Sequence, residues 1–369
     1  MEEPVLSNTN QSEIVCKNCA AKLKFAPGTS HLKCEYCGAE NEIHVDKDAL
    51  REAVKEIDFN DFLNKQTEIA PMQEVITVKC NSCGAETTFD PNVISSECDF
   101  CGSPMVAKQG EKHNVIQPKA LLPFKIEEKK SLEMFKTWIN KLWWAPNALK
   151  KQAKQTGKIN GVYIPYWTYD SRTHTSYRGD RGDDYQVREA YQKDGKTEYR
   201  TVTKTRWSAV SGRVNNVFDD ILVVASKSLP VKYMDKLEPW NFQELVPYED
   251  KFLTGFKTES YQVDVKQGFE VSKQKMDPMI EQTIRRDIGG DHQRIHSKST
   301  QYSDITFKHI LLPIWISAYR YNNKVFRFMV NGQTGEVQGE RPYSWIKITL
   351  AVLFVIAVIA IIMYFANNS

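Results

Sequence analysis

The segments CKNCAAKLKFAPGTSHLKCEYC (16–37) and CNSCGAETTFDPNVISSECDFC (80–101) contain all eight cysteines of this 369-residue chain. Each has the spacing C-x2-C, fourteen residues, C-x2-C, and the second segment follows the first by 64 residues. The repeat also retains Ala21, Phe25, Pro27 and Gly38 as Ala85, Phe89, Pro91 and Gly102. The chain therefore contains an internal duplication, and we call the two segments the first and the second cysteine array.

Two C-x2-C turns present four thiolates, which complete a closed tetrahedral shell around zinc. Disulfides are disfavoured because the cytosol is reducing, whereas iron accepts the same four ligands. A closed shell leaves no position for a substrate, so we expect a structural metal. We predict two zinc ions per chain, with iron as the less favoured metal, at Cys16, Cys19, Cys34 and Cys37 and at Cys80, Cys83, Cys98 and Cys101.

The segments 14–45 and 78–108 resemble zinc ribbons of the transcription-factor-IIB and rubredoxin type, which bind nucleic acid or protein. Their lysine, aspartate and glutamate counts give net charges of +1 and −2, and a zinc ion with four thiolates lowers these to −1 and −4. Phosphate binding normally requires a basic face. The charges therefore favour protein partners and argue against nucleic acid.

Residues 346–366 form a predicted transmembrane helix. Its core, ITLAVLFVIAVIAIIMYFA (348–366), has no charged residue, and it reaches about 28 Å at about 1.5 Å per residue, close to the ~30 Å hydrocarbon core of a bilayer. Arg341 and Lys347 precede this core and no basic residue follows it, so the positive-inside tendency places the preceding domains in the cytoplasm. MEEPVLSNTN (1–10) lacks the apolar region of a signal peptide. We expect a single-pass, tail-anchored protein of the inner (cell) membrane.

Residues 112–340 form a predicted aromatic-rich α+β domain. Its proline–aromatic stretches LLPFKI (121–126), VYIPYWTYD (162–170) and LLPIWISAYRY (311–321) predict three related strand starts, because proline is tolerated near the beginning of a strand. Strands and helices alternate here without regular β-α-β spacing, which argues against a doubly wound sheet.

Further patterns within this domain predict individual elements. Leu132, Phe135, Ile139 and Leu142 share one helical stripe. Asp277 and Pro278 resemble a cap followed by a first helical residue, so a second helix should start there. The turn 193–196 closes a predicted hairpin. The alternating residues of VFRFMVNGQTGEV (325–337) turn at Asn331–Gly332 and Thr334–Gly335 and return as a short strand.

Two segments complete the predicted domain organisation. Residues 1–13 are expected to be a disordered N-terminus. Residues 46–77 are expected to form an amphipathic helix that joins the two ribbons, because Leu50, Val54 and Ile57 have helical spacing. The acidic residues of this linker are predicted to form a solvated face rather than a site.

Apparent catalytic motifs fail on their context. Gly195-Lys196-Thr197 lacks the first glycine and the following helix of a phosphate-binding loop. His292 and His296 lie four residues apart on a predicted helix end, but they lack further ligands in a recognised order. No cysteine outside the arrays is available as a nucleophile. We therefore expect no enzymatic activity.

The segment KLWWAPNALKKQAKQTGK (141–158) contains five lysines, two tryptophans and no acidic residue. One interpretation is a helix end with Trp143 or Trp144 in the core and the lysines in water. The other is an interfacial patch that contacts anionic lipid headgroups. Both interpretations are left open by the sequence.

The combination of two cysteine arrays, GVYIPYWTYD (161–170), LLPIWISAYRYNNKVFRFMVNGQTGEV (311–337) and a terminal membrane helix resembles the bacterial membrane proteins with transcription-factor-IIB-type zinc ribbons. In some bacteria such proteins are encoded beside phage-shock-protein-A-like and SPFH (flotillin-like) proteins. The resemblance therefore implies a non-enzymatic adaptor that recruits such partners to the cytoplasmic face of the membrane, as in a membrane-stress response. The alternative is a membrane-tethered nucleic-acid-binding protein linked to replication or transcription. The hairpin region 183–214 has no counterpart in this resemblance.

Overall fold

The structure, a computed structural model, describes residues 14–64, 72–82, 84–89, 95–98, 100, 103–106, 111–148, 150, 159–193, 196–321 and 324–367. Residues 1–13, predicted to be disordered, lie outside this part of the chain. The described residues form a mixed α+β fold, as the sequence predicts, and it ends in the apolar helix α9 (Trp345–Asn367).

The largest sheet contains three long strands: β11 (Asn160–Lys193), β12 (Lys196–Val224) and β15 (His292–Tyr321). The sheet has the order β12-β11-β15-β10-β13, in which β10 is Ala120–Leu121 and β13 is Val246–Pro247. β11 lies antiparallel to β12 and to β15, and it also pairs in parallel with the short β14 (Lys257–Thr258). The β11–β12 pairing runs from Tyr166 and Val224 out to Lys193 and Lys196, interrupted by one bulge. The predicted hairpin is therefore confirmed, although the turn residues 194–195 lie outside the described residues.

Of the three predicted strand starts, the one at VYIPYWTYD (162–170) is confirmed, since β11 begins at Asn160, and the other two are wrong. Pro165 and Pro313 lie inside β11 and β15, and Pro123 follows the two-residue strand β10 (Ala120–Leu121). Pro165 and Pro313 have no N–H to donate, but their carbonyl oxygens accept hydrogen bonds. Ala225 N–H donates to Pro165 O (3.0 Å), and Gly332 N–H donates to Pro313 O (2.8 Å). Both strands continue because burial of their side chains outweighs the missing donors.

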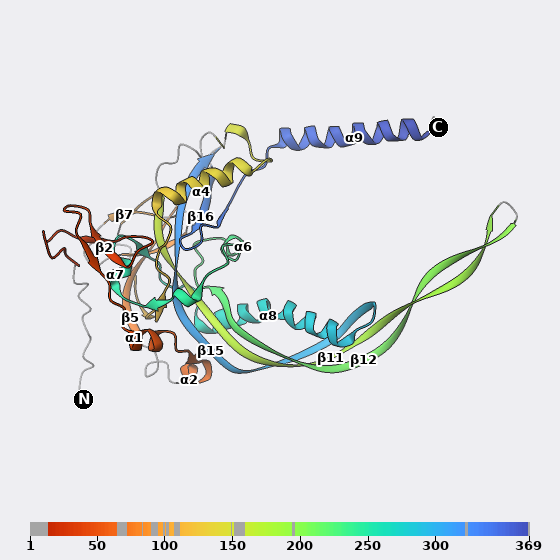
Figure 1. The fold of residues 1–369 in the computed structure, drawn as a ribbon, viewed down its shortest axis with the longest axis horizontal. Helices are drawn as coiled ribbons and strands as arrows, with labels where there is room; N and C mark the ends of the chain where they lie inside the picture. The colour runs from red at the N-terminus through yellow and green to blue at the C-terminus, as the bar shows by residue number, and fades with distance from the viewer. Residues whose placement is uncertain are drawn as a thin grey trace.

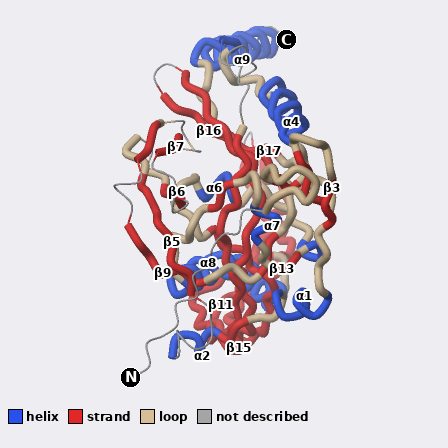
Figure 2. The backbone as a smooth tube through the Cα atoms, turned by 90° about the vertical axis from the view of Figure 1, so that its left-hand side faces the viewer, coloured by secondary structure: helices blue, strands red, loops and turns tan. Residues whose placement is uncertain are grey.

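Within the body, β11 and β15 are buried on both faces, because successive side chains of a strand point to opposite sides. Alternate residues of β15 pack in two different hydrophobic clusters: Ile310, Leu312, Ile314 and Ile316 in one, and Leu311 and Trp315 in the other. The first cluster contains Cys80 and Cys98, and the second contains Cys16 and Cys34. The two cysteine arrays therefore cover opposite faces of one sheet, and Figure 2 shows β6 and β7 on one side of the body and β3 on the other.

The first array forms a three-stranded antiparallel sheet of β1 (Leu23–Phe25), β2 (His31–Cys34) and β3 (Glu40–Glu42). The second array belongs to a sheet of β6 (Glu86–Phe89), β5 (Met72–Lys79) and β9 (Glu111–Ile116). The second array also contributes a separate two-stranded sheet, β7 (Ser95–Glu97) with β8 (Pro104–Val106).

The helix α8 (Val265–Ile288) lies along β11, β12 and β15, which curve beneath it in Figure 1. Asp264 caps the helix by accepting Gln267 N–H at 2.8 Å. The predicted start at Pro278 is wrong, because this proline lies inside the helix. Buried residues occur on both sides of it, from Phe269 to Ile284, and their burial outweighs the ~3 kcal/mol that an interior proline costs.

The linker predicted as one helix contains α1 (Lys47–Ala53) and α2 (Phe59–Asn64), separated by the short strand β4 (Ile57–Asp58). β4 pairs with β15. Phe62 packs edge-on against Phe307 with ring centroids 5.1 Å apart. The linker is therefore part of the body, because its aromatic residues are buried against the central sheet.

The remaining elements surround this sheet. The predicted stripe 132–142 is confirmed as α4 (Glu128–Lys141), whose Phe135 stacks on Phe328 of β16. The turn after Asn331 is also confirmed, since β16 is followed by the antiparallel β17. The elements not yet given are β16 (Lys324–Asn331), β17 (Val337–Gly339), α6 (Val231–Met234), η2 (Phe242–Glu244) and α7 (Asp250–Leu253).

A two-stranded hairpin projects from the body where β15 begins. The last β11–β15 pair is Gly182 with His292, so beyond it β11 pairs with β12 alone. We call residues 183–206 the hairpin arm. Figure 1 shows that the arm and α9 leave the body toward the same side.

The contact between α8 and β11 can be tested at Gly268. A Cβ added there would overlap the Tyr169 hydroxyl and lie 2.9 Å from Trp167 Cδ1. We expect Gly268→Ala to lower the free energy of unfolding by about 1–3 kcal/mol through overpacking, measured by chemical denaturation in detergent micelles. Tyr169→Phe removes the overlapping oxygen, so the double variant should lose less than the two single losses added together. A stabilising Gly268→Ala would contradict the close packing.

Candidate metal centre

The first cysteine array brings its four sulfur atoms together. Cys16 Sγ lies 3.6 Å from Cys37 Sγ, and Cys19 Sγ lies 3.5 Å from Cys34 Sγ. All four sulfurs lie within 4.8 Å of one another. A tetrahedral shell with Zn–S distances of about 2.3 Å has sulfur–sulfur distances of about 3.8 Å. The donor set therefore fits a tetrahedral thiolate-bound metal ion.

Tight backbone turns hold the sulfurs of the first array. Ala20 N–H donates to Cys16 O at 2.8 Å, and Gly38 N–H donates to Cys34 O at 3.0 Å. Both donors have positive φ, 57° at Ala20 and 73° at Gly38. Glycine adopts this conformation without strain, which is the physical reason for a glycine directly after the second C-x2-C pair.

The same turns favour the thiolate form at two of the four ligands, Cys34 and Cys16, whereas hydrogen bonds with the thiols of Cys34 and Cys37 raise the pKa of Cys19. The Cys37 backbone N–H points at Cys34 Sγ and is the main cause that lowers the pKa of Cys34 to about 6. Asn18 N–H lies 3.4 Å from Cys16 Sγ and lowers the pKa of that thiol. Metal binding requires deprotonated sulfur, so these backbone donors prepare the array for a cation.

The second array repeats the turns of the first within the described residues. Gly84 N–H donates to Cys80 O at 2.8 Å, the equivalent of the Ala20 bond, and Cys98 N–H donates to Ser103 O at 2.8 Å, the equivalent of Cys34 N–H to Ala39 O. Cys80 and Cys98 are buried, like Cys16 and Cys34. Cys83 and Cys101 lie outside the described residues, so a second metal ion stays a prediction.

The first array is docked firmly on the body. Phe25 is buried and packs edge-on against Phe252 of α7, with ring centroids 5.4 Å apart. Phe25 N–H donates to Thr254 O at 3.1 Å, and Gly28 N–H donates to Phe124 O at 2.9 Å. Phe25 therefore serves the core and is not available to a partner. The exposed residues of this array include the ligands Cys19 and Cys37 and their neighbour Tyr36, which is 90% exposed.

The two histidines considered as ligands lie on a strand rather than a helix end. His292 and His296 belong to β15, and each faces one carboxylate: Asp184 Oδ2 at 3.1 Å and Asp180 Oδ2 at 2.8 Å. The described residues bring no further metal ligand into these pairs. They connect neighbouring strands and form no metal cluster.

A buried ion network that sequence reasoning missed holds the linker on the sheet. Lys308 Nζ lies 3.0 Å from Glu56 Oε1 and 2.9 Å from Asp220 Oδ1. Glu56, Asp170 and Asp219 place carboxylate oxygens within 4.8 Å of one another. The Lys308 ammonium already supplies the positive charge that a cation would bring, so the cluster is a structural network. Asp219–Asp220, two acids inside an apolar strand, is the signal that would have indicated it.

Hydrogen bonding separates the pKa values of the two central carboxyls in this network. Desolvation, together with the neighbouring Glu56, raises the pKa of Asp170 to about 7. Burial opposes the ionised form of Glu56 as well, but hydrogen bonds from Asp170, Thr306 and Lys308 lower its pKa to about 2. Asp170 therefore keeps its proton below neutral pH and loses it as the pH rises through about 7, while Glu56 stays ionised. The prediction that the acidic residues of the linker form only a solvated face is wrong at Glu56.

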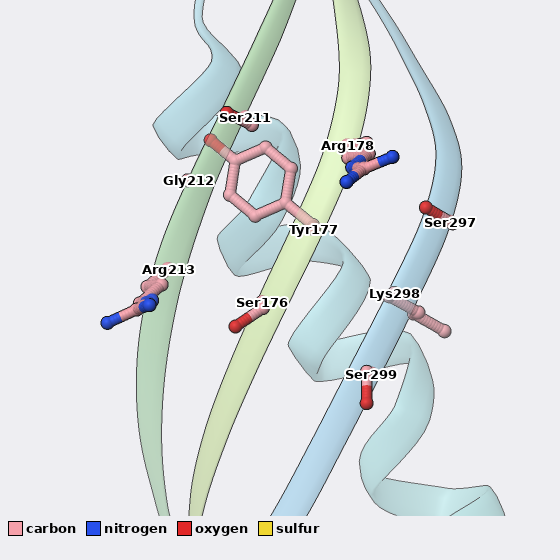
Figure 3. Close-up of a pocket in the computed structure, with 9 residues that line it drawn as sticks. All are labelled: Ser176, Tyr177, Arg178, Ser211, Gly212, Arg213, Ser297, Lys298 and Ser299. Atoms are coloured by element: carbon pink, nitrogen blue, oxygen red, sulfur yellow. The ribbon is translucent and has the colours of Figure 1, made fainter.

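A shallow depression of about 530 Å³ lies across β12, β11 and β15, beside Arg178 and Arg213 (Figure 3). The two arginine side chains point in opposite directions in Figure 3. They do not converge on a common ligand, so the depression is no anion site.

No protein-family model matches the chain, and no solved structure matches it. The chain is similar to the uncharacterized protein YdjG of Bacillus subtilis (strain 168), with 26% identity over 319 residues that cover 73% of this chain and 91% of the relative.

A buried glutamate joins the second array to the body, and no sequence pattern indicated it. Glu259 is 2% exposed and accepts a hydrogen bond from the Ser228 hydroxyl. Ser228 Oγ in turn accepts Glu86 N–H of β6 at 3.2 Å. Burial raises the pKa of Glu259 to about 8. Its carboxyl is therefore protonated at neutral pH, at the contact between the array and the sheet.

The metal prediction is tested by removing one thiolate. We expect Cys34→Ser in the full chain to lower the bound metal by about one ion, because three thiolates no longer close the shell. Elemental analysis of detergent-purified protein measures this, with Tyr36→Ser, an exposed neighbour, as the control that keeps its metal. Iron in the purified protein, or equal metal in both variants, would contradict a zinc centre.

The pKa of Glu259 predicts a dependence of stability on pH. In the unfolded chain Glu259 loses its proton above pH 4.5, whereas in the folded chain it keeps the proton up to about pH 8. The contribution of the protonated Glu259 to the free energy of unfolding is therefore complete below pH 4.5 and is lost as the pH rises to about 8. We expect the thermal midpoint in detergent to fall over this range, and Glu259→Gln to reduce the fall because its amide does not ionise. Glu133→Gln, which changes an exposed side chain of α4, is the control. An identical pH profile for Glu259→Gln and the parent would contradict the assignment.

Proposed function

We propose that this protein is a membrane-anchored adaptor that binds protein partners and has no catalytic function. The observation that carries the proposal is the hairpin arm. A two-stranded hairpin alone is marginally stable in water, and within the described residues the outer edge of β12 pairs with no other strand. An open strand edge of this kind is a template for a strand supplied by a partner.

The side chains of the arm support recognition of protein. Arginines lie over tyrosines across the two strands, as in Arg188 over Tyr199 at 5.5 Å and Arg206 over Tyr185 at 5.6 Å. The tyrosines are exposed by 64% and 42%. Tyrosine and arginine are the residue types that concentrate binding energy in protein interfaces. The arm therefore presents a partly apolar surface with an open edge.

The charge of the arm argues against nucleic acid as its main partner. Residues 183–206 contain six basic and five acidic residues, a net charge of +1. Lys204 is paired with Glu189 at 2.6 Å, which neutralises one of the basic residues. Phosphate contacts would need an excess of basic side chains, so membrane-tethered nucleic-acid binding is the weaker candidate.

The metal and the membrane helix complete the proposal. The thiolate geometry supports zinc as a structural ion in the first array, and the repeated turns support a second zinc in the other array. The helix Trp345–Ala366 is long and apolar enough to cross a membrane. The basic residues Arg341 and Lys347 at its start favour an orientation with the body in the cytoplasm, and a bacterial inner membrane is the compartment that the family resemblance suggests.

The resemblance also suggests the class of partner. Proteins of the phage-shock-protein-A-like and SPFH (flotillin-like) types are the partners that such adaptors are expected to recruit. We therefore infer a role in assembling membrane-stress proteins at the cytoplasmic face.

The proposal is tested by capture of partners from native membranes in mild detergent. We expect the full chain to retain specific membrane-associated proteins, and Tyr185→Ser with Tyr199→Ser to lose them at least tenfold, because the exposed rings are removed from the arm. Val217→Ser, at a 76%-exposed position elsewhere on β12, is the control. Partner proteins identified by mass spectrometry should belong to the membrane fraction.

Two results would overturn the adaptor. One is equal capture by the arm variant and by the parent chain. The other is salt-resistant binding of DNA or RNA without any co-purifying protein, which would favour the nucleic-acid alternative.

A further inference from the structure

Two tryptophans that follow α4 are exposed to solvent. Trp143 is 73% exposed and Trp144 is 40% exposed. Their neighbours Leu142 and Ala145 are buried in the core at 7% and 1%, so the loop is held on the body while the two indole rings face outward. The sequence left open whether one of these rings fills the core, and the structure places neither there. Large exposed aromatic surfaces mark contact sites.

The loop lies beside the point where α9 leaves the body. Ser344, the residue before the helix, donates its N–H to Trp144 O at 2.8 Å. Lys347 Nζ donates to Trp143 O at 3.0 Å and to Ala145 O at 2.9 Å. The Ser344 bond holds the base of the helix against the loop whatever direction the helix then takes.

The base of α9 adds further exposed aromatic side chains. Tyr343 is 55% exposed and Trp345 is 81% exposed. Arg341 lies over the Tyr343 ring at 5.7 Å, and Lys347 lies over the Trp143 ring at 5.9 Å. Aromatic rings with an apolar body and a polar edge concentrate at the boundary between acyl chains and headgroups.

The charges of this surface have one sign. The segments 141–150 and 341–347 contain four basic residues and no acidic residue. Each basic residue near an anionic leaflet contributes about 1 kcal/mol to binding. Lys151, Lys154 and Lys158 of the same sequence patch lie outside the described residues.

We propose that Trp143, Trp144, Tyr343 and Trp345 form one lipid-contacting surface, the aromatic collar, which seats the body on an anionic membrane. The Lys347 ammonium holds the loop in place through Trp143 O, Ala145 O and Asn147 Oδ1 (2.9 Å). The collar rests on the proposed function in one respect, namely that α9 spans the bilayer. The lipid occupant follows from continuity with α9, because the collar begins where the apolar helix begins, and from the exclusively basic charge.

The experiment places the photoreactive amino acid p-benzoylphenylalanine at one position at a time in the full chain. Trp143 tests the collar, Phe354 in the middle of α9 reports insertion of the helix, and Val217 on β12 reports random encounters. The protein is reconstituted in vesicles of phosphatidylethanolamine with phosphatidylglycerol, irradiated, and analysed for lipid adducts by mass spectrometry. We expect adducts at positions 143 and 354 at least tenfold above those at 217.

The outcomes separate the collar from the anchor. Adducts at 354 without adducts at 143, or adducts at 143 to protein rather than lipid, would overturn the collar and leave the anchor standing. Absence of adducts at 354 would overturn the anchor and the collar together. Omission of phosphatidylglycerol should lower the yield at 143 severalfold while the yield at 354 stays constant. An unchanged yield at 143 would overturn the preference for anionic lipid.

Discussion

Burial of β11 and β15 on both faces is the constraint on which the rest of this molecule depends. A sheet with two apolar faces is unstable in water until each face is covered, since about 25 cal/mol is lost for each Å² of apolar surface left exposed. One face is covered by the first cysteine array together with α4 and α7, and the opposite face by the second array. The chain thus has one array for each face of the sheet, and each array covers the side chains that point to its own face.

This arrangement links metal binding to the stability of the whole body. An array of about thirty residues has little core of its own, so a metal ion bound by its thiolates would supply much of its folding free energy. Cys16 and Cys34 are buried within the same cluster as Leu311 and Trp315 of the central strand. A metal ion bound at this site would therefore support the interior, and its loss would uncover an apolar face of the sheet.

Local patterns predicted what local interactions determine. The cysteine ligands of the first array, the helix 128–141, the hairpin closed at 193–196 and the apolar helix could all be read from spacing and periodicity. The lengths of β11 and β15 could not, because their distal halves are polar and are strands only through pairing with each other and with β12. The same reason hides the role of Pro278, Glu56 and Glu259, whose positions are decided by residues far away in the sequence. Long-range burial overrode short-range signals at each of these sites.

The common direction of the hairpin arm and α9 limits how the body can sit on a membrane. A bilayer crossed along α9 as drawn in Figure 1 would also enclose the arm, whose 24 residues include eleven charged ones. A charged side chain at the bilayer centre costs at least about 2.5 kcal/mol. With α9 across a bilayer, as proposed, the body has to turn about the junction at Ser344 so that the arm stays outside the hydrocarbon core. The arm then lies beside the membrane surface, where a partner confined to the same membrane meets it at a higher local concentration than one in bulk solution.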